Sequence, residues 1–290
     1  MWEKPVIQKL SDDRLQLHHG PIRVVLKAWG DPETVRKVQR LVTRHFPKIL
    51  PELGEELTAL RMPSDGKAAA FKSITAQRMA DAAAPFADVF VTPMAAVAGA
   101  VAEEILRIMM SAGPLDKAYV NDGGDIALYV GPGQSLTFGI AGDFSLGSTP
   151  VLNGTLTIDD AFALQGIATS GAQGRSFSLG IADSVTVLAK TAGVADVAAT
   201  LIANAVNIER PTIKREKARS LDPDSDLGDQ LVTTEVGRLK TEDIDIALDA
   251  GLVRAQDYLN RGLIAGACLM LRGESRVIGA PLATLEGGKP

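Results

Sequence analysis

The chain has 290 residues, of which 46% are hydrophobic, enough for a sizeable core in one large or two ordinary domains. Its 35 acidic and 30 basic residues give a formal net charge of -5, and no basic block is dense enough for a nucleic-acid backbone, so nucleic acid is not an expected partner. The N-terminal residues lack an apolar signal core and the longest apolar run, 93–102, is too short to cross a bilayer, so we expect a cytoplasmic protein without membrane contact.

The first predicted elements are two strands and a helix. Apolar and polar residues alternate over 14–29 on either side of a Gly-Pro turn, which predicts a strand pair. Asp31-Pro32 then begins a charged helical stretch, which we expect Pro47 and Pro51 to interrupt because proline cannot donate a helical hydrogen bond.

Two further helices precede a β-rich region. A short helix is predicted over 74–86, and a longer one begins at Thr92-Pro93, where threonine can cap the helix and proline fits its first turn. The small residues of the longer helix predict that it is buried against a neighbour. Short β-rich runs separated by Gly, Ser and Asp clusters follow at 127–130, 136–140, 154–158 and 184–189. They predict an antiparallel or mixed sheet.

The last third of the chain is mainly helical. Helices are predicted over 193–207 and 241–260, separated by a charged, turn-rich segment at about 209–230 that we expect to be an exposed loop. A final strand over 263–271 contains the single cysteine, Cys268, which we expect to be a buried, unreactive thiol. Strands and helices that segregate in this way argue for a single α+β domain over 1–290, with a mixed sheet packed with helices.

The stretch V-N-D-G-G-D-I, at 120–126, places three polar side chains around two glycines. It allows two interpretations. Asp-Gly and Gly-Gly pairs commonly connect antiparallel strands, so the stretch predicts a hairpin turn. Alternatively, the glycines uncover backbone N–H groups and the acids accept hydrogen bonds or bind a cation.

A narrow polar stripe follows the predicted helix at 193–207. Asp196, Thr200, Asn204 and Asn207 share one face, and the rest of the helix is apolar. A carboxylate and a hydroxyl at i and i+4 suit a hard cation such as Mg²⁺. The alternative is an ordinary exposed face of unusual composition.

A Gly/Ser-rich loop is the third candidate. A predicted strand ends at Ser170-Gly171, and Arg175 and Ser176 lie in the loop that follows. Exposed N–H groups, hydroxyls and one guanidinium together suit a phosphate or pyrophosphate. The alternative is a long polar hairpin loop, because the segment matches no P-loop or dinucleotide fingerprint.

Taken together, these segments resemble the ApbE superfamily, best known for flavin transferases that move FMN from FAD onto a threonine or serine of a target protein. V-N-D-G-G-D-I resembles the Val-Asn-x-Gly-Gly-Asp-Ile signature, and I-A-T-S-G resembles the Ala-x-x-Ser-Gly turn. S-V-T-V-L-A and A-D-V-A-A-T-L resemble the Ser-Val-Thr-Val strand and the Ala-Asp-x-x-x-Thr helix. Order and spacing agree across 118–207.

The resemblance implies an ApbE-like, T-fold-related architecture with a flavin or nucleotide pocket for FAD or FMN. It places the family's metal-binding residues, with Mg²⁺ as the expected ion, at Asp196 and Thr200. The expected ligand-contacting residues are Asn121, Gly123, Gly124, Asp125, Ser170, Gly171, Arg175 and Ser176.

Two differences separate this chain from the flavin transferases. It lacks their His-Ile-Ile-Asp-Pro-x-x-Gly segment before S-V-T-V, and their Ala-Lys-Gly motif is replaced by Val97-Ala98-Gly99. We therefore do not expect FMN transfer to protein, and name Asp183 and Asp122 as candidate replacement bases.

The leading functional hypothesis is a Mg²⁺-dependent transferase acting on a flavin or nucleotide. The alternative is a non-catalytic flavin- or nucleotide-binding or accessory protein of the uncharacterised cytoplasmic branch, some members of which are associated with sulfur amino-acid (homocysteine) synthesis. The sequence leaves the oligomeric state open, and a homo-oligomer is compatible with it.

Overall fold

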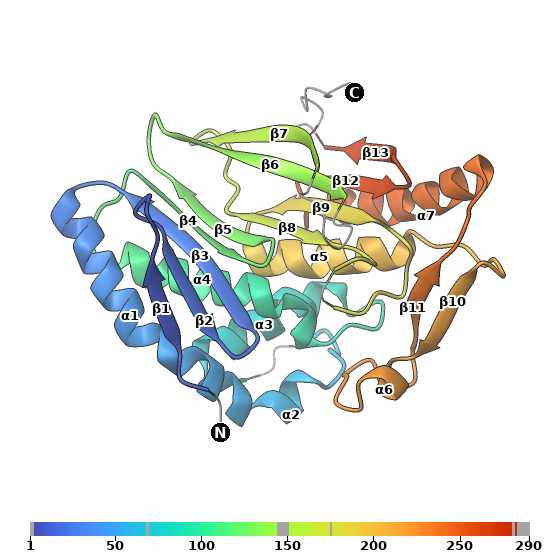
Figure 1. Cartoon of the computed structure of the whole chain (residues 1–290), viewed down its shortest axis with the longest axis horizontal. Helices are drawn as coiled ribbons and strands as arrows, with labels where there is room; N and C mark the ends of the chain where they lie inside the picture. Colours follow the sequence, from blue (N-terminus) through green and yellow to red (C-terminus); the bar gives the residue numbers. More distant parts are fainter. Residues whose placement is uncertain (1–2, 68–69, 144–150, 175, 280–281, 283–290) are drawn as a thin grey trace. The chain divides into compact units, whose positions relative to one another are not determined.

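The computed structural model describes residues 3–67, 70–143, 151–174, 176–279 and 282 (Figure 1). Its contacts divide the chain into two compact units, each assembled from several segments. Unit 1 comprises Met1–Leu136, Thr157–Ala168 and Ala189–Val197, and unit 2 comprises Thr137–Leu156, Thr169–Leu188 and Ala198–Pro290. Strand β8 (Gly166–Ser170) and helix α5 (Ala192–Ala205) run from one unit into the other. That the chain acts as a single ApbE-like domain stays a prediction.

The sheet of unit 1 contains six described strands in the order β1-β2-β3-β4-β5-β8, all paired antiparallel. Besides β8, they are β1 (Val6–Lys9), β2 (Leu15–His19), β3 (Ile22–Trp29), β4 (Lys117–Asp122) and β5 (Asp125–Val130). The strand pair predicted over 14–29 is confirmed as β2 and β3. Alternate residues of these strands are buried because one face of the sheet is covered by helices.

Two long helices, α1 (Pro32–Glu55) and α4 (Val97–Met110), pack against strands β2 to β5 (Figure 1). Helix α3 (Ile74–Ala83) packs on α4. The short helix α2 (Leu57–Leu60) precedes α3 in sequence, and the 3₁₀ helices η1 (Ala84–Phe86) and η2 (Pro93–Ala96) lie between α3 and α4. The predicted burial of the helix after Thr92 is confirmed for α4. Thr92 has extended backbone angles, but its side chain makes no capping hydrogen bond.

Helix α1 contains Pro47 and Pro51 yet continues from Pro32 to Glu55, so the predicted interruption is wrong. A proline inside a helix loses one hydrogen bond and crowds the preceding turn, at a cost of about 3 kcal/mol. Around the prolines, Phe46, Ile49, Leu50 and Leu53 are buried. Burying a large apolar side chain contributes roughly 1.5 to 3 kcal/mol, so packing offsets the backbone cost.

Unit 2 contains an antiparallel set of strands, β9 (Ser184–Ala189), β12 (Gly266–Leu271) and β13 (Glu274–Ile278). Helix α7 (Thr241–Asn260) has the predicted bounds. It packs on β12 and β13. Cys268 is buried in β12, and burial raises the pKa of its thiol to about 11, which fits an unreactive cysteine.

Two further strand pairs are separate from these sheets. One is β6 (Ser135–Asp143) with β7 (Val151–Asp159), and the other is β10 (Ile213–Lys217) with β11 (Leu231–Val236). With α6 (Ala218–Leu221), β10 occupies part of the segment expected to be an irregular loop at 209–230. Many side chains of β10 and β11 are charged, and Lys214 forms an ion pair with Glu235 across the two strands. The sequence therefore lacks the alternation of apolar and polar residues from which a strand would be predicted. The α+β class is confirmed, and the strand pairs whose register the structure gives are antiparallel, which agrees with the predicted antiparallel or mixed sheet.

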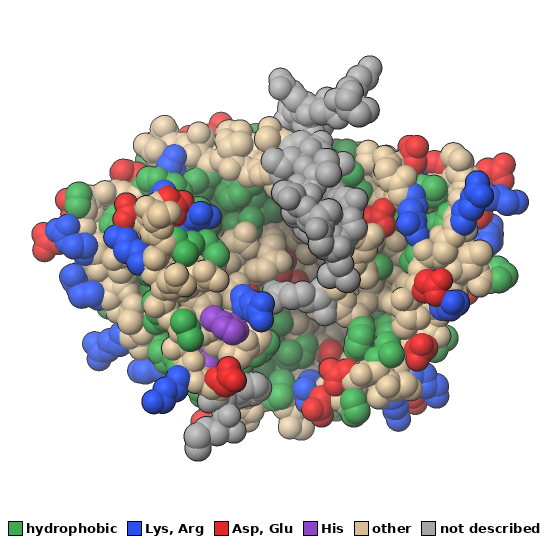
Figure 2. Space-filling model, in the orientation of Figure 1, with side chains coloured by type: hydrophobic (Ala, Val, Ile, Leu, Met, Phe, Trp, Pro, Cys, Tyr) green, Lys and Arg blue, Asp and Glu red, His purple; other side chains and the backbone are tan. Residues whose placement is uncertain are grey.

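The charged surface follows the composition. Figure 2 shows basic side chains gathered at the edge formed by α1. In the sequence of α1, Arg36, Arg40 and Arg44 follow one another by one helical turn. Elsewhere on the face shown, acidic and basic side chains are interspersed. Among the described helices, none combines the length and the apolar character needed to span a bilayer.

Candidate functional site

The V-N-D-G-G-D-I stretch forms the tight turn between β4 and β5. Asp122 is paired with Asp125, so Gly123 and Gly124 form a two-residue connection, with φ angles of 70° and 118°. Residues with a side chain rarely adopt such angles, which explains both glycines. The Asn121 Oδ1 accepts the Gly124 N–H at 2.9 Å and closes the turn. The hairpin interpretation is therefore confirmed.

Asp122 does more than flank this turn. It is only 3% exposed and lies on the same side of β4 as the buried residues Ala118 and Val120. One of its carboxylate oxygens accepts the backbone N–H of Arg23 at 3.2 Å. A carboxylate is thus held inside unit 1, on the strand that packs against α4.

Asp196, on the first turns of α5, is the second carboxylate of this region of unit 1. Its Oδ2 accepts the N–H of Gly99 at 3.0 Å, and the N–H of Ala98 also donates to it. The Asp196 side chain is half-buried. Its pKa is raised to about 7, mainly by burial and to a lesser extent by the negative charge of Asp122, and the two backbone donors act in the opposite direction. The charges of Asp122 and Asp196 therefore interact within unit 1.

The start of α4 touches the start of α5 directly. A Cβ added to Gly99 would lie 2.3 Å from the carbonyl oxygen of Ala192, so only glycine allows this approach. Gly99 is the residue that the Val97-Ala98-Gly99 segment shares with the Ala-Lys-Gly motif of the flavin transferases. Its glycine keeps the backbone N–H within reach of Asp196, although the lysine is absent.

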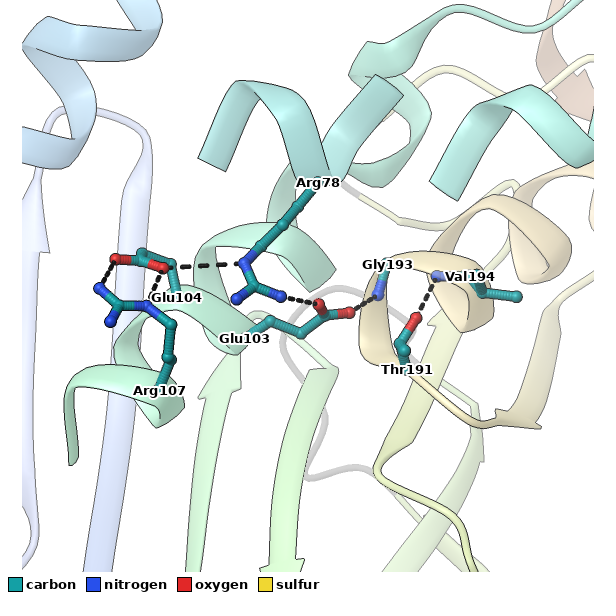
Figure 3. A network of polar contacts seen from close by, with 7 residues as sticks. All are labelled: Arg78, Glu103, Glu104, Arg107, Thr191, Gly193 and Val194. Atoms are coloured by element: carbon teal, nitrogen blue, oxygen red, sulfur yellow. Dashed lines mark hydrogen bonds and ion pairs between the residues drawn. The ribbon is translucent and has the colours of Figure 1, made fainter. Parts of the chain in front are cut away.

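Further polar contacts join α4 to the start of α5, and they were not predicted from the sequence (Figure 3). Glu103 of α4 accepts the N–H of Gly193 at 2.7 Å, and the Thr191 hydroxyl accepts the N–H of Val194 at 3.3 Å. Arg78 forms an ion pair with Glu103 at 3.1 Å. One signal could have identified Glu103, because an acid beside a run of small apolar residues is as unusual as Asp196 on its own helix.

The remaining stripe residues of α5 belong to unit 2. The hydroxyls of Thr200 and Ser170 are 3.5 Å apart. Asn204 accepts the N–H of Leu179 at 2.9 Å, and Asn207 donates to the carbonyl oxygen of the same residue at 3.1 Å. The four stripe residues are half-buried, so the ordinary exposed face is the wrong interpretation. Asn204 and Asn207 hold the neighbouring chain segment, which leaves Asp196 and Thr200 as the candidates for ligand binding.

The Gly/Ser-rich loop of unit 2 is described only in part. Arg175 lies outside the described residues, and Ser176 is exposed. Gly171 lies against the chain at Asp183, where an added Cβ would be 2.4 Å from a carbonyl oxygen. The carboxylate of Asp183 accepts the backbone N–H of Arg272, at the turn between β12 and β13, and a side-chain N–H of Gln173. These bonds give Asp183 a structural role, and its role as a base stays a prediction.

The oxygen atoms at Asp196 suit a hard cation, but the protein supplies few charged ligands for it. Within the described part of the chain, no three His, Cys, Asp or Glu side chains gather in a metal-binding group. A Mg²⁺ ion at Asp196 would therefore need hydroxyl, backbone carbonyl, water or ligand oxygens to complete its shell. Mg²⁺ commonly binds through one or two carboxylates plus substrate phosphates, so the residues present fit this mode.

The antiparallel sheets, the buried helix α4 and the carboxylate on α5 define an α+β protein with the ApbE fold. The ApbE protein of Thermotoga maritima has a crystal structure that matches 99% of both chains, with a TM-score of 0.51 at 12% sequence identity. This likeness shows the fold. The family model described as AbpE bacteria matches residues 7–277, and the chain belongs to that family. The family resemblance predicted from the motifs is thereby confirmed.

The chain is also similar to UPF0280 proteins. A UPF0280 protein of Methanothrix thermoacetophila is 41% identical over 117 residues, which make up 40% of this chain and 46% of the relative. A UPF0280 protein of Methanosarcina acetivorans is 34% identical over 123 residues, or 42% and 46% of the two chains. The chain thus spans about half the length of the curated relatives that it matches.

Proposed function

We propose that this protein binds Mg²⁺ or Mn²⁺ at Asp196 and uses the ion to hold the phosphates of a flavin, FAD or FMN, or of another nucleotide. Thr200 follows Asp196 by one turn of α5 and is the second proposed metal ligand. When bound, the ion would supply a positive charge that orients and polarises a phosphate.

One observation carries this proposal, namely the carboxylate pair in unit 1. Asp122 is buried and Asp196 is half-buried, and the repulsion between their charges contributes to the raised pKa of Asp196. Two such carboxylates destabilise a folded protein unless a proton or a cation compensates them. At neutral pH a divalent cation would relieve the repulsion, which supports the proposal of a cation at Asp196.

Two glycine-containing turns, one in each unit, are proposed separately as ligand-contacting segments. Gly123 and Gly124 form the β4–β5 turn of unit 1, with Asp125 at its end. In unit 2, Ser170 ends β8 and Gly171 follows it. Arg175 and Ser176 are proposed to contact the phosphates, because a guanidinium can donate two parallel hydrogen bonds to an anion. Asn121 is engaged with Gly124, so we propose that it shapes the turn that receives the ligand.

The proposed activity is a metal-dependent transfer from a flavin or nucleotide in the cytoplasm, without FMN transfer to protein. Asp122 is the better candidate base of the two, because its charge acts on Asp196, whereas Asp183 holds the turn at Arg272. The missing histidine segment and lysine favour a second candidate, a non-catalytic flavin- or nucleotide-binding accessory protein, with a link to homocysteine synthesis as its proposed context.

Native mass spectrometry of the purified protein tests the ligand class, since a flavin or nucleotide that co-purifies would be identified by mass. Incubation with FAD and Mg²⁺ then separates the two candidates. Release of FMN or AMP that stops in Asp122→Asn supports the enzyme, whereas tight binding without turnover supports the accessory protein. Absence of binding to any flavin or nucleotide, with or without Mg²⁺, would contradict both.

A further inference from the structure

We infer that Glu103 is a positioning residue for Asp196, acting through the first turn of α5. The inference rests on the proposed function, because the position of Asp196 matters most if that carboxylate binds the cation. Glu103 itself lies on α4 and contacts the backbone of α5 (Figure 3).

The two helices hold each other by reciprocal hydrogen bonds. Glu103, a side chain of α4, accepts the backbone N–H of Gly193 in α5 at 2.7 Å. Asp196, a side chain of α5, accepts the backbone N–H of Gly99 in α4 at 3.0 Å. Gly99 and Glu103 are one turn apart on α4, and Gly193 and Asp196 are about one turn apart on α5. The two bonds therefore fix both the position and the rotation of the first turn of α5.

The start of α5 is closely packed against α4. The carbonyl of Ala192 lies against Gly99, and a Cβ added to Gly193 would lie 3.2 Å from the Cβ of Ala82 and 3.4 Å from Glu103. If the bond between Glu103 and Gly193 were lost, the first turn of α5 could move away from α4. The Asp196 carboxylate would move with it and lose its fixed geometry.

The environment of Glu103 suits this role. Its side chain is 14% exposed, and Arg78 balances its charge in a contact of 3.1 Å. A negative charge at the start of a helix also interacts favourably with the helix dipole. At the same helix terminus, Thr191 accepts the N–H of Val194, so two of the unpaired donors of the first turn have partners.

The adjacent residue Glu104 provides a matched control. It is buried to a similar extent, with a side chain 9% exposed, and it pairs with Arg107 at 2.6 Å and with Arg78 at 3.7 Å. None of its described contacts reaches α5 (Figure 3). Substitution of Glu104 thus removes a comparable ion pair from the same helix without touching the helix that carries Asp196.

The experiment measures Mn²⁺ affinity by calorimetry in the full chain, without flavin, for the wild type, Glu103→Ala, Glu103→Gln and Glu104→Ala. Loss of a residue that orients a metal ligand typically weakens metal binding by about 10- to 100-fold, and we expect this for Glu103→Ala. Glu103→Gln keeps an oxygen that can accept the Gly193 N–H, so it should remain close to the wild type. Glu104→Ala should bind Mn²⁺ normally even where its thermal midpoint falls.

Hydrogen exchange at 193–197 is the second measurement, and it does not require metal. Glu103→Ala should exchange faster there than Glu104→Ala. If Glu103→Ala does not fold, Glu103→Asp, which is one methylene too short to reach Gly193, replaces it. Unchanged Mn²⁺ affinity in the folded variant, or an equal loss in Glu104→Ala, would overturn the positioning role alone. A wild type that binds no Mn²⁺ would overturn the proposed metal site and this role together.

Discussion

Replacement of Asp196 by asparagine should stabilise the metal-free protein and abolish its response to metal. Asparagine has the same shape, and its Oδ1 can still accept the N–H of Gly99, which now lies 3.0 Å from the carboxylate. Its amide carries no charge, so the repulsion from Asp122 is removed. The variant therefore removes the charge while it keeps the packing of α4 against α5.

The size of the effect follows from the pKa. The pKa of Asp196 rises from 3.8 to about 7 on folding, so the ionised carboxylate disfavours the folded state. About three pH units at 1.36 kcal/mol each give an upper value of about 4 kcal/mol for this cost. The cost is absent below pH 3.8, grows as the pH rises towards 7, and is complete above it. Asp196→Asn should therefore gain about 2 to 4 kcal/mol at pH 8 and very little at pH 4.

Thermal or urea unfolding in EDTA at pH 8 and pH 4 measures this difference directly. Saturating Mn²⁺, at a hundredfold excess over its dissociation constant, should stabilise the wild type by about 2.7 kcal/mol and leave Asp196→Asn unchanged. Asp183→Asn is the control, because its carboxylate accepts the Arg272 N–H and its replacement should not stabilise the protein. A metal-free Asp196→Asn variant that is less stable than the wild type at pH 8 would refute the reasoning.

Four other predictions follow from the site. Mn²⁺ affinity in the wild type should fall about tenfold per pH unit below pH 7, because the ion must displace the proton of Asp196, and calorimetry that shows a flat profile from pH 5.5 to 8 would contradict this. Gly99→Ala should lose roughly 2 to 3 kcal/mol in urea unfolding, more than Gly193→Ala, because its Cβ would meet the Ala192 carbonyl at 2.3 Å; equal losses would argue against the close helix contact. Asn121→Ala should lose about 1 kcal/mol because the Gly124 N–H loses its acceptor, and unchanged stability would mean that water replaces the side chain. Incubation with FAD, Mg²⁺ and a threonine peptide should give no FMN adduct by mass spectrometry, and a metal-dependent adduct would show that another base replaces the missing histidine.

Elements with a strong local pattern could be predicted from the sequence. The strand pair within 14–29, strand β9 and helix α7 were predicted correctly, because alternation and helical periodicity report directly on one buried face. Local rules failed where tertiary packing prevails. Helix α1 continues through Pro47 and Pro51 because buried neighbours hold it, and β10 forms although its side chains are charged.

In the candidate site, too, some features could be predicted from local sequence patterns and others could not. The turn at Gly123 and Gly124 and the polar stripe of α5 were visible as local motifs. The contact between Gly99 and Asp196 joins residues 97 positions apart, and the contact between Glu103 and Gly193 joins residues 90 positions apart. No local period encodes such pairs, so their meeting follows from the way α4 and α5 pack.

The central claim, that a cation at Asp196 holds the phosphates of a flavin or nucleotide, is tested most directly by titration of FAD into the protein with and without Mg²⁺. Flavin fluorescence reports binding in the wild type and in Asp196→Asn under the same conditions. The proposed site predicts that Mg²⁺ tightens FAD binding to the wild type and has no effect on Asp196→Asn. Equal FAD affinity of the wild type with and without Mg²⁺, or an equal effect of Mg²⁺ on both proteins, would contradict it.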